Sequence, residues 1–359
     1  GLVYVVIALV VKLAGIKWID KVMPACVIGP TVALIGLSLA GAAVNDVFSY
    51  GAKTTFGISS YFIMDTAAWV SLTCALVTLL VVILVSTYGK KMAKLIPFII
   101  GIAAGYVTAT IFTLIGEATG NAALKVVDFS LFQNVNILAV PEFTFLEAFK
   151  GINDLTFNRV ITIAVAYVPV AFVVFAEHLA DHKNLSSIIG SDLLEEPGLH
   201  RTLLGDGLAT TLASLFGAPA NTTYGENTGV LALSKVYDPK VVRLAAIFAM
   251  VLSFCPKFAA LIVAMPAATM GGVSLVLYGM ISAVGVRNVV ENQVDFTKSR
   301  NVLIAAMIMG LAVGVTYAGS IIIPLGAVTI SLSGLAVAAL VGIGMNAILP
   351  GKDYEFGTN

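Results

Sequence analysis

The chain of 359 residues is 59% hydrophobic and only 11% charged, and its mean hydropathy is +0.99. Soluble domains average about 25% charged residues, so this composition excludes an ordinary soluble protein and indicates one that crosses a lipid bilayer several times. The net charge is zero, with 20 basic and 20 acidic residues, which excludes the basic footprint of a nucleic-acid-binding protein.

A helix needs about 20 apolar residues to cross a bilayer, and on that measure the chain contains eleven expected membrane segments. The first has only eleven residues before Lys12 and looks cut short. The segments cover residues 1–14, 24–46, 64–87, 94–116, 159–182, 198–217, 220–236, 240–264, 266–286, 300–318 and 325–349.

The loops between these segments differ in charge. Placing alternate loops on one side of the membrane collects 15 of the 20 basic residues there and leaves 5 on the other. Because cytoplasmic loops carry the excess of Lys and Arg, we expect a cytoplasmic C-terminus and an external, ordered connection over residues 117–158.

Two similar stretches open the second and ninth segments. Residues 23–29 read Met-Pro-Ala-Cys-Val-Ile-Gly, and residues 265–271 read Met-Pro-Ala-Ala-Thr-Met-Gly. Seven spans separate them, an odd number, so the two copies would enter the membrane from opposite sides, as an inverted repeat requires. If each repeat has seven spans, segments five to eleven complete one repeat, and the other lacks its first three spans.

Residues 218–235 form a polar island in this apolar chain. Pro219 and Gly225 disfavour a continuous helix, and the β-branched pair Thr222 and Thr223 favours a short strand near residues 219–224. Residues 229–235 can restart as a helix. The sequence therefore predicts a broken membrane segment, which lipid tolerates only where protein or a wet cavity covers it.

Three carboxylates stand in apolar surroundings and are candidates for a ligand or proton site. Glu226 would lie near the positive N-terminal end of the restarted helix, a place that suits a small polar ligand. Glu177 and Asp181 are spaced i, i+4 and share one helical face. Intramembrane carboxylates usually face a cavity or a proton path, although a helix end where charges meet water would also explain this pair.

The histidines, tyrosines and cysteines leave more alternatives open. His178 and His182 are interpreted as structural or interfacial, although a His whose pKa lies near neutral pH can share a proton. Tyr224 can stack on or hydrogen-bond a ring, whereas Tyr278 either faces the cavity or is a core residue. We interpret His200 as interfacial. The three cysteines have no metal-ligand spacing, and we interpret them as small buried hydrophobes; they are Cys26, Cys74 and Cys255.

Three strings resemble the nucleobase–cation symporter-2 family, also called nucleobase–ascorbate transporters. They are Val-Phe-Ala-Glu-His-Leu at 174–179, Pro-Gly-Leu-His-Arg at 197–201 and Asn-Thr-Thr-Tyr-Gly-Glu-Asn-Thr-Gly-Val at 221–230. The likeness is strongest to the bacterial uracil permeases of that family and covers essentially the whole chain.

The resemblance implies an all-α polytopic membrane protein with fourteen spans in two inverted repeats of seven. In that family the spans form a core and a gate domain, and short strands in spans three and ten meet at the substrate. On this scheme spans one to three, with an aromatic wall of the pocket, are absent here. The domains would be 1–16 (core, remnant of span 4), 17–116 (gate, spans 5–7), 117–158 (external connection), 159–264 (core, spans 8–11), 265–350 (gate, spans 12–14) and 351–359 (cytoplasmic tail).

The resemblance also assigns roles to residues. Glu177 and Glu226 would hold the base, Gly225 would offer backbone contacts, and Tyr224 and Tyr278 would lie near the ligand. Proton coupling would involve Asp181, with Glu177 and His178. The signature continues through Asn227, Gly229 and Lys235, with Ser234 where Thr is usual.

The function implied is proton-coupled uptake of uracil by alternating access across the bacterial cytoplasmic membrane. Many purine transporters of the family carry Gln where Glu226 stands, so the Glu favours uracil over xanthine, uric acid or another purine. The expected partners are a nucleobase, protons, the lipid bilayer and a second copy bound through the gate domain. No cofactor, metal or nucleic acid is expected.

Two other hypotheses belong to different classes. The chain can be an inactive, N-terminally truncated fragment of such a permease. A membrane-embedded enzyme is disfavoured because the sequence has neither a Gly-x-Ser-x-Gly nor a His-Glu-x-x-His motif.

Overall fold

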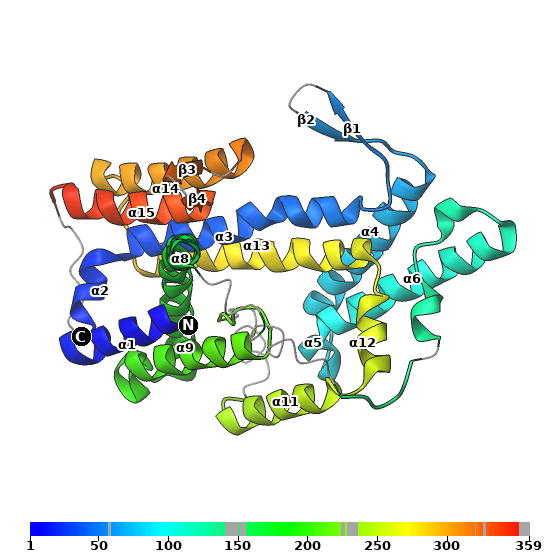
Figure 1. Ribbon diagram of the computed structural model, residues 1–359, viewed down its shortest axis with the longest axis horizontal. Coiled ribbons are helices and arrows are strands. Elements are labelled where there is room, and N and C mark those ends of the chain that lie inside the picture. Colours follow the sequence, from blue (N-terminus) through cyan, green and yellow to red (C-terminus); the bar gives the residue numbers. More distant parts are fainter. Residues whose placement is uncertain are drawn as a thin grey trace. The chain divides into compact units, whose positions relative to one another are not determined.

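The computed structural model describes residues 1–56, 59–133, 135–140, 150, 156–223, 227, 236–319, 321–325 and 328–351. This part of the chain is mostly helical, as the composition predicts, with two short β-hairpins. The chain forms two compact units, and the long helices α3 (Ala25–Val47) and α13 (Ala267–Glu291) contribute residues to both (Figure 1).

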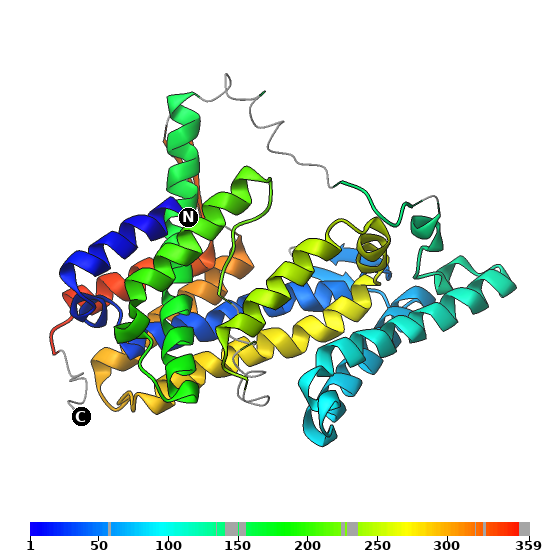
Figure 2. The same cartoon turned by 90° about the horizontal axis from the view of Figure 1, so that it is seen from below.

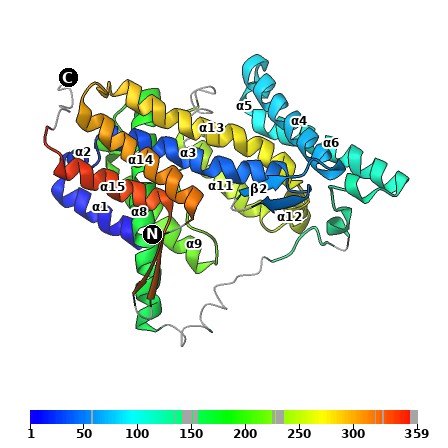
Figure 3. The ribbon, with the colours of Figure 1, turned by 90° about the horizontal axis from the view of Figure 1, so that it is seen from above.

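The first unit contains residues 1–38, 143–228 and 280–359. In it α1 packs on α9, α14 packs on α15, and the second hairpin lies beside α8 (Figure 3). Besides parts of α3 and α13, its elements are α1 (Leu2–Ala14), α2 (Lys17–Val22), α8 (Phe157–Ile189), a π-helical turn η4 (Leu194–Gly198), α9 (Leu199–Leu215), α14 (Ser299–Ala318), β3 (Ile321–Leu325), β4 (Val328–Leu332) and α15 (Gly334–Ile348).

The core of the first unit follows from helical periodicity. On α1 the buried residues are Tyr4, Ile7, Ala8 and Val11, a spacing that places them on one face of the helix. They pack with buried residues of α8 and α9, including Leu203. The helix thereby covers the part of α8 that carries the candidate carboxylates.

The second unit contains residues 39–142 and 229–279, and α4 and α6 form its longest helix pair (Figure 2). Gly105 on α6 faces Thr78 of α4 and Thr269 of α13 so closely that a Cβ there would clash, which explains the small residue. Besides parts of α3 and α13, its elements are β1 (Lys53–Phe56), β2 (Ser59–Phe62), α4 (Thr66–Tyr88), α5 (Met92–Leu95), α6 (Pro97–Thr119), η1 (Ala122–Leu124), η2 (Phe129–Phe132), α11 (Pro239–Leu252) and α12 (Pro256–Val263).

Fewer helices qualify as membrane spans than the eleven segments expected. Among the described residues, six helices are long and apolar enough, or seven if the bent pair α11 and α12 counts as one. Helices α1 and α15, with 13 and 15 residues, are shorter than the span of about 20 residues that a bilayer needs. Helix α9 is not among the six, and its sequence includes Arg201 and Asp206. The chain is therefore a multi-pass membrane protein whose elements are not all full spans.

Two of the expected spans are corrected by the structure. The apolar segment 240–264 is not one straight helix, because α11 and α12 meet at an angle of 96° beside Pro256. Segment 325–349 contains strand β4, whose residues pair with β3, and helix α15 starts only after the N-cap Ser333. The alternating sequence Val-Thr-Ile-Ser-Leu suits a strand better than a helix.

A buried polar cluster joins three helices of the first unit. The side chain of Asn346, only 2% exposed, donates to the backbone oxygens of Lys21 (2.7 Å) and Val22 (3.1 Å) at the end of α2. Its own backbone oxygen and Oδ1 accept from the Arg300 guanidinium at 3.0 and 2.5 Å. Asn346 thus satisfies carbonyls that the end of α2 leaves without helical partners.

Replacing Asn346 by Leu should destabilise the fold by several kcal/mol, because each buried polar group left without a partner costs about 1–3 kcal/mol. The matched control is Asn45→Leu, since Asn45 also bonds a backbone oxygen and a lysine but is exposed. Its effect should stay within about 0.5 kcal/mol. Chemical unfolding in detergent measures both, and equal effects would contradict the role given to Asn346.

Candidate functional site

The candidate site is built on helix α8, which starts and ends at recognisable signals. The Thr156 hydroxyl accepts from the backbone N–H of Arg159 at the start, and Gly190 adopts the left-handed conformation at the end. The helix is longer than the expected segment 159–182. Glu177 and Asp181 both lie on it, one turn apart, so they share a helical face as the spacing predicts.

The two carboxylates are withdrawn from the surface of the first unit. Glu177 is half-buried, and Asp181 is 5% exposed. Between them lies His178, which is 2% exposed. A buried carboxylate is costly inside a membrane unless other polar groups or a wet cavity surround it, so this turn of α8 has the character of a polar site.

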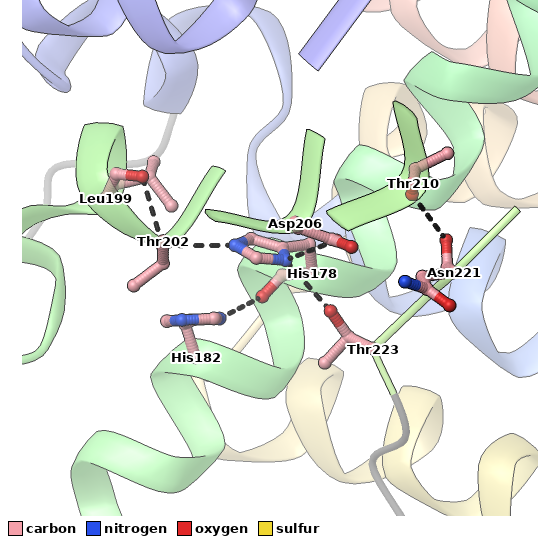
Figure 4. A network of polar contacts seen from close by, with 8 residues as sticks. All are labelled: His178, His182, Leu199, Thr202, Asp206, Thr210, Asn221 and Thr223. Atoms are coloured by element: carbon pink, nitrogen blue, oxygen red, sulfur yellow. Dashed lines mark hydrogen bonds and ion pairs between the residues drawn. The ribbon is translucent and has the colours of Figure 1, made fainter. Parts of the chain in front are cut away.

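His178 is held by side chains from two other segments (Figure 4). Its Nε2 lies 3.1 Å from the hydroxyl oxygen of Thr202 on α9, and its Nδ1 lies 2.8 Å from the hydroxyl oxygen of Thr223. The Thr202 hydroxyl donates to the backbone oxygen of Leu199 at 3.0 Å. A hydroxyl has one hydrogen, so Nε2 of His178 is the donor to Thr202.

Two further polar groups adjoin the same imidazole. A carboxylate oxygen of Asp206, on α9, lies 3.4 Å from Nδ1 of His178, and the ring of His182 stacks on it at 4.1 Å between centroids. The Tyr4 ring meets it edge-on at 6.0 Å. The imidazole is therefore enclosed from α1, α8 and α9, with a carboxylate next to the nitrogen that faces Thr223.

The polar island begins after α9 with an interruption of helical structure. Residues 216–223 are not helical, as the sequence predicts, and the Thr210 hydroxyl donates to the backbone oxygen of Asn221 at 3.4 Å (Figure 4). The strand expected near 219–224 is absent from its described part, residues 219–223. A strand needs a hydrogen-bonded neighbour, and both hairpins of the described chain lie elsewhere.

The sequence matches the model of the Permease family over residues 1–321. It is 37% identical to the uracil permease of Bacillus caldolyticus over 98% of this chain and 73% of the relative. The uracil permease of Bacillus subtilis (strain 168) is also 37% identical, over 99% of this chain and 75% of the relative. The uracil permease of Escherichia coli (strain K12) is 35% identical, over 97% and 72%. The chain belongs to this permease family.

Membership in the permease family makes the protein a transporter rather than an enzyme. The relevant chemistry is therefore reversible binding and passage of a small molecule. Within the described ranges, no three His, Cys, Asp or Glu side chains gather as metal ligands would.

The other residues singled out in this permease are placed as follows. Tyr278 is half-buried in the second unit, and Asn227 is helical and exposed. His200 is half-buried in the first turn of α9. The predictions that fall outside the described residues are those for Tyr224, Gly225, Glu226, Gly229, Ser234 and Lys235.

Sequence reasoning missed three residues of the candidate site. They are Thr202, Asp206 and Thr223, which surround His178. Thr202 and Asp206 are four residues apart on α9 and so share a face, the same spacing that singled out Glu177 and Asp181. Searching the segment 198–217 for polar pairs at this spacing would have found them.

Proposed function

We propose that the protein takes up uracil by proton-coupled symport, with alternating access to its site. The observation that carries the proposal is 35–37% identity to relatives named uracil permease over 97–99% of the chain. The buried acidic turn of α8 supports it, because a polar ligand that enters a membrane protein needs such groups.

The chemistry of uracil suits the proposed carboxylates. The ring presents N–H donors and C=O acceptors in one plane. Glu177 and Glu226 accept from the N–H groups, while backbone amides around Gly225 donate to the carbonyls and Tyr224 and Tyr278 lie against the ligand. Hydrogen bonds to an ionised acceptor are about twice as strong as neutral ones, so this pairing favours a ring that turns its N–H groups toward the two carboxylates.

Proton coupling follows from the cost of moving a buried charge. Asp181 takes up a proton, with Glu177 and His178 close to it, when the base binds. The proton removes one buried negative charge before the site crosses, which lowers the cost of moving its carboxylates past hydrocarbon. This assignment is supported by the burial of Asp181 and His178 on the same turn as Glu177.

We further propose the inverted-repeat architecture with core and gate domains that the sequence suggests. Both similar stretches stand at the start of long apolar helices, since α3 begins at Ala25 and α13 at Ala267. In the first unit Gly29 lies against Val289 and Ala33 against Gly285, so the two helices run antiparallel. Opposite directions are what an inverted repeat requires.

The proposed location is the bacterial cytoplasmic membrane, with the C-terminus in the cytoplasm. It is supported by the division of basic residues, 15 against 5, between alternate loops. A homodimer through the gate domain is part of the same proposal and rests on the family resemblance alone.

Competition binding tests the substrate. Purified protein in detergent should bind radiolabelled uracil, and unlabelled uracil should displace it at far lower concentration than xanthine or uric acid. The reverse order would identify a purine permease of the same family. Conversion of the added base into another compound would contradict a protein that only transports it.

A further inference from the structure

The hydrogen bonds around His178 form a continuous chain between α9 and the polar island. The chain runs from the backbone oxygen of Leu199 through the Thr202 hydroxyl and the His178 imidazole to the Thr223 hydroxyl. Thr223 directly precedes Tyr224 in the sequence. The imidazole thus connects a regular helix to the last described residue before the proposed ligand contacts.

The direction of each hydrogen bond follows from the donors available. Because Nε2 of His178 donates to Thr202, the neutral imidazole carries no hydrogen on Nδ1 and accepts from the Thr223 hydroxyl. If Nδ1 gains a proton it becomes a donor to the same hydroxyl oxygen, with the Asp206 carboxylate 3.4 Å away to balance the charge. The link between His178 and Thr223 is therefore retained in both protonation states.

The surroundings keep the imidazole in a single orientation. The titratable groups that face or adjoin it are Glu177, Asp181 and His182 on its own helix, Asp206 on α9 and Tyr4 on α1. The His182 Nδ1 lies 2.9 Å from the backbone oxygen of His178, and its ring stacks on that of His178. A ring that is buried, stacked and bonded at both nitrogens cannot turn without breaking several contacts.

Residues 219–223 belong to no helix or strand, so the regular backbone hydrogen bonds that fix such elements do not hold them. Side-chain bonds replace them, from Thr210 to Asn221 and between His178 and Thr223. Of these two, the bond at Thr223 is the shorter, at 2.8 against 3.4 Å, and it lies nearer to Glu226 in the sequence.

We propose that His178 is a positioning residue of the binding site, which fixes Thr223, the last described residue before the proposed ligand contacts, through their hydrogen bond. Its role is to hold the described end of the polar island at Thr223, whatever its protonation state. The proposal deepens the proposed function and rests on it for the identity of the ligand.

The test separates the two nitrogens of the ring. In His178→Asn the amide occupies the place of Nδ1 and can still bond Thr223, whereas in His178→Gln it occupies the place of Nε2 and bonds only Thr202. We expect His178→Asn to bind uracil with an affinity within about threefold of wild type. His178→Gln should bind uracil about tenfold more weakly, because it loses the buried hydrogen bond to Thr223. His200→Gln, outside the chain of bonds, serves as control and should bind as wild type does.

A second pair tests the same bond from its other end. Thr223→Val keeps the shape of the side chain and removes the hydroxyl, so uracil affinity should fall about tenfold, while Thr223→Ser should restore it. Uracil affinity unchanged in Thr223→Val and His178→Gln would overturn the proposal. So would an equal loss in Thr223→Ser and Thr223→Val, because packing rather than the hydroxyl would then be responsible. If His178→Gln does not fold, the Thr223 pair decides.

Hydrogen exchange of residues 218–223 gives a readout that needs no ligand. The amides should exchange faster in Thr223→Val than in wild type and Thr223→Ser, and equal rates in all three would contradict the positioning role. If wild type binds xanthine but not uracil, the proposed substrate fails, and the same variants measured with xanthine still test the positioning of Thr223.

Discussion

Glu226→Gln should weaken uracil binding by about 10- to 150-fold. A hydrogen bond to a charged group contributes about 1.5–3 kcal/mol, and each 1.4 kcal/mol changes affinity tenfold. The neutral amide keeps the size of the side chain but loses the charge, and only one of its two polar atoms can accept from a ring N–H. Glu177→Gln should have an effect of similar size, since both carboxylates accept from the ring in the proposed pose.

Glu117→Gln is the matched control, because Glu117 lies on α6 and is exposed. It should bind uracil as wild type does. Equilibrium binding to the purified proteins measures all three variants, and tight uracil binding by Glu226→Gln would rule out the proposed pose.

Gly285→Ala should destabilise the first unit by about 1–3 kcal/mol, the usual cost of overpacking. A Cβ at Gly285 would meet the backbone of Ala33 and the backbone oxygen of Gly29, so helices α3 and α13 would have to separate. Backbone atoms cannot move aside as the end of a flexible side chain can. Close approach of these two helices therefore requires glycine at this position.

Gly279→Ala on the same helix is the control, because nothing lies within 4 Å of a Cβ built there. In a helix interior Ala is about 1 kcal/mol more favourable than Gly, so this variant should be neutral or slightly more stable. Thermal unfolding in detergent compares the two. Equal melting temperatures would show that α3 and α13 do not depend on the contact at Gly285.

The long apolar helices were predictable because length and hydropathy suffice for them. Expected segments 24–46 and 300–318 correspond to α3 and α14 almost residue for residue. The bend between α11 and α12 was not predicted, although Pro256 marks it in the sequence, because the expected segment 240–264 was defined by its length and hydropathy. Both hairpins were missed. The first lies in the connection between two expected segments, and the second lies at the start of segment 325–349, where a 20-residue measure averages over strands of five residues.

The candidate site was predictable on α8 and less so around it. Glu177 and Asp181 are marked by their spacing within one apolar helix. The partners of His178 come from α9 and from Thr223, 24 and 45 residues away, and only tertiary packing brings them together. The interruption after α9 was predicted correctly from Pro219 and its polar neighbours, while the domain assignments and residue roles stay predictions.

Uracil accumulation in proteoliposomes tests the central claim most directly. Vesicles containing the protein, with an interior more alkaline than the medium, should concentrate radiolabelled uracil above the external level. Adding a protonophore should collapse the accumulation to the level of empty vesicles. Accumulation that persists without the proton gradient, or none above empty vesicles in its presence, would contradict a proton-coupled uracil permease.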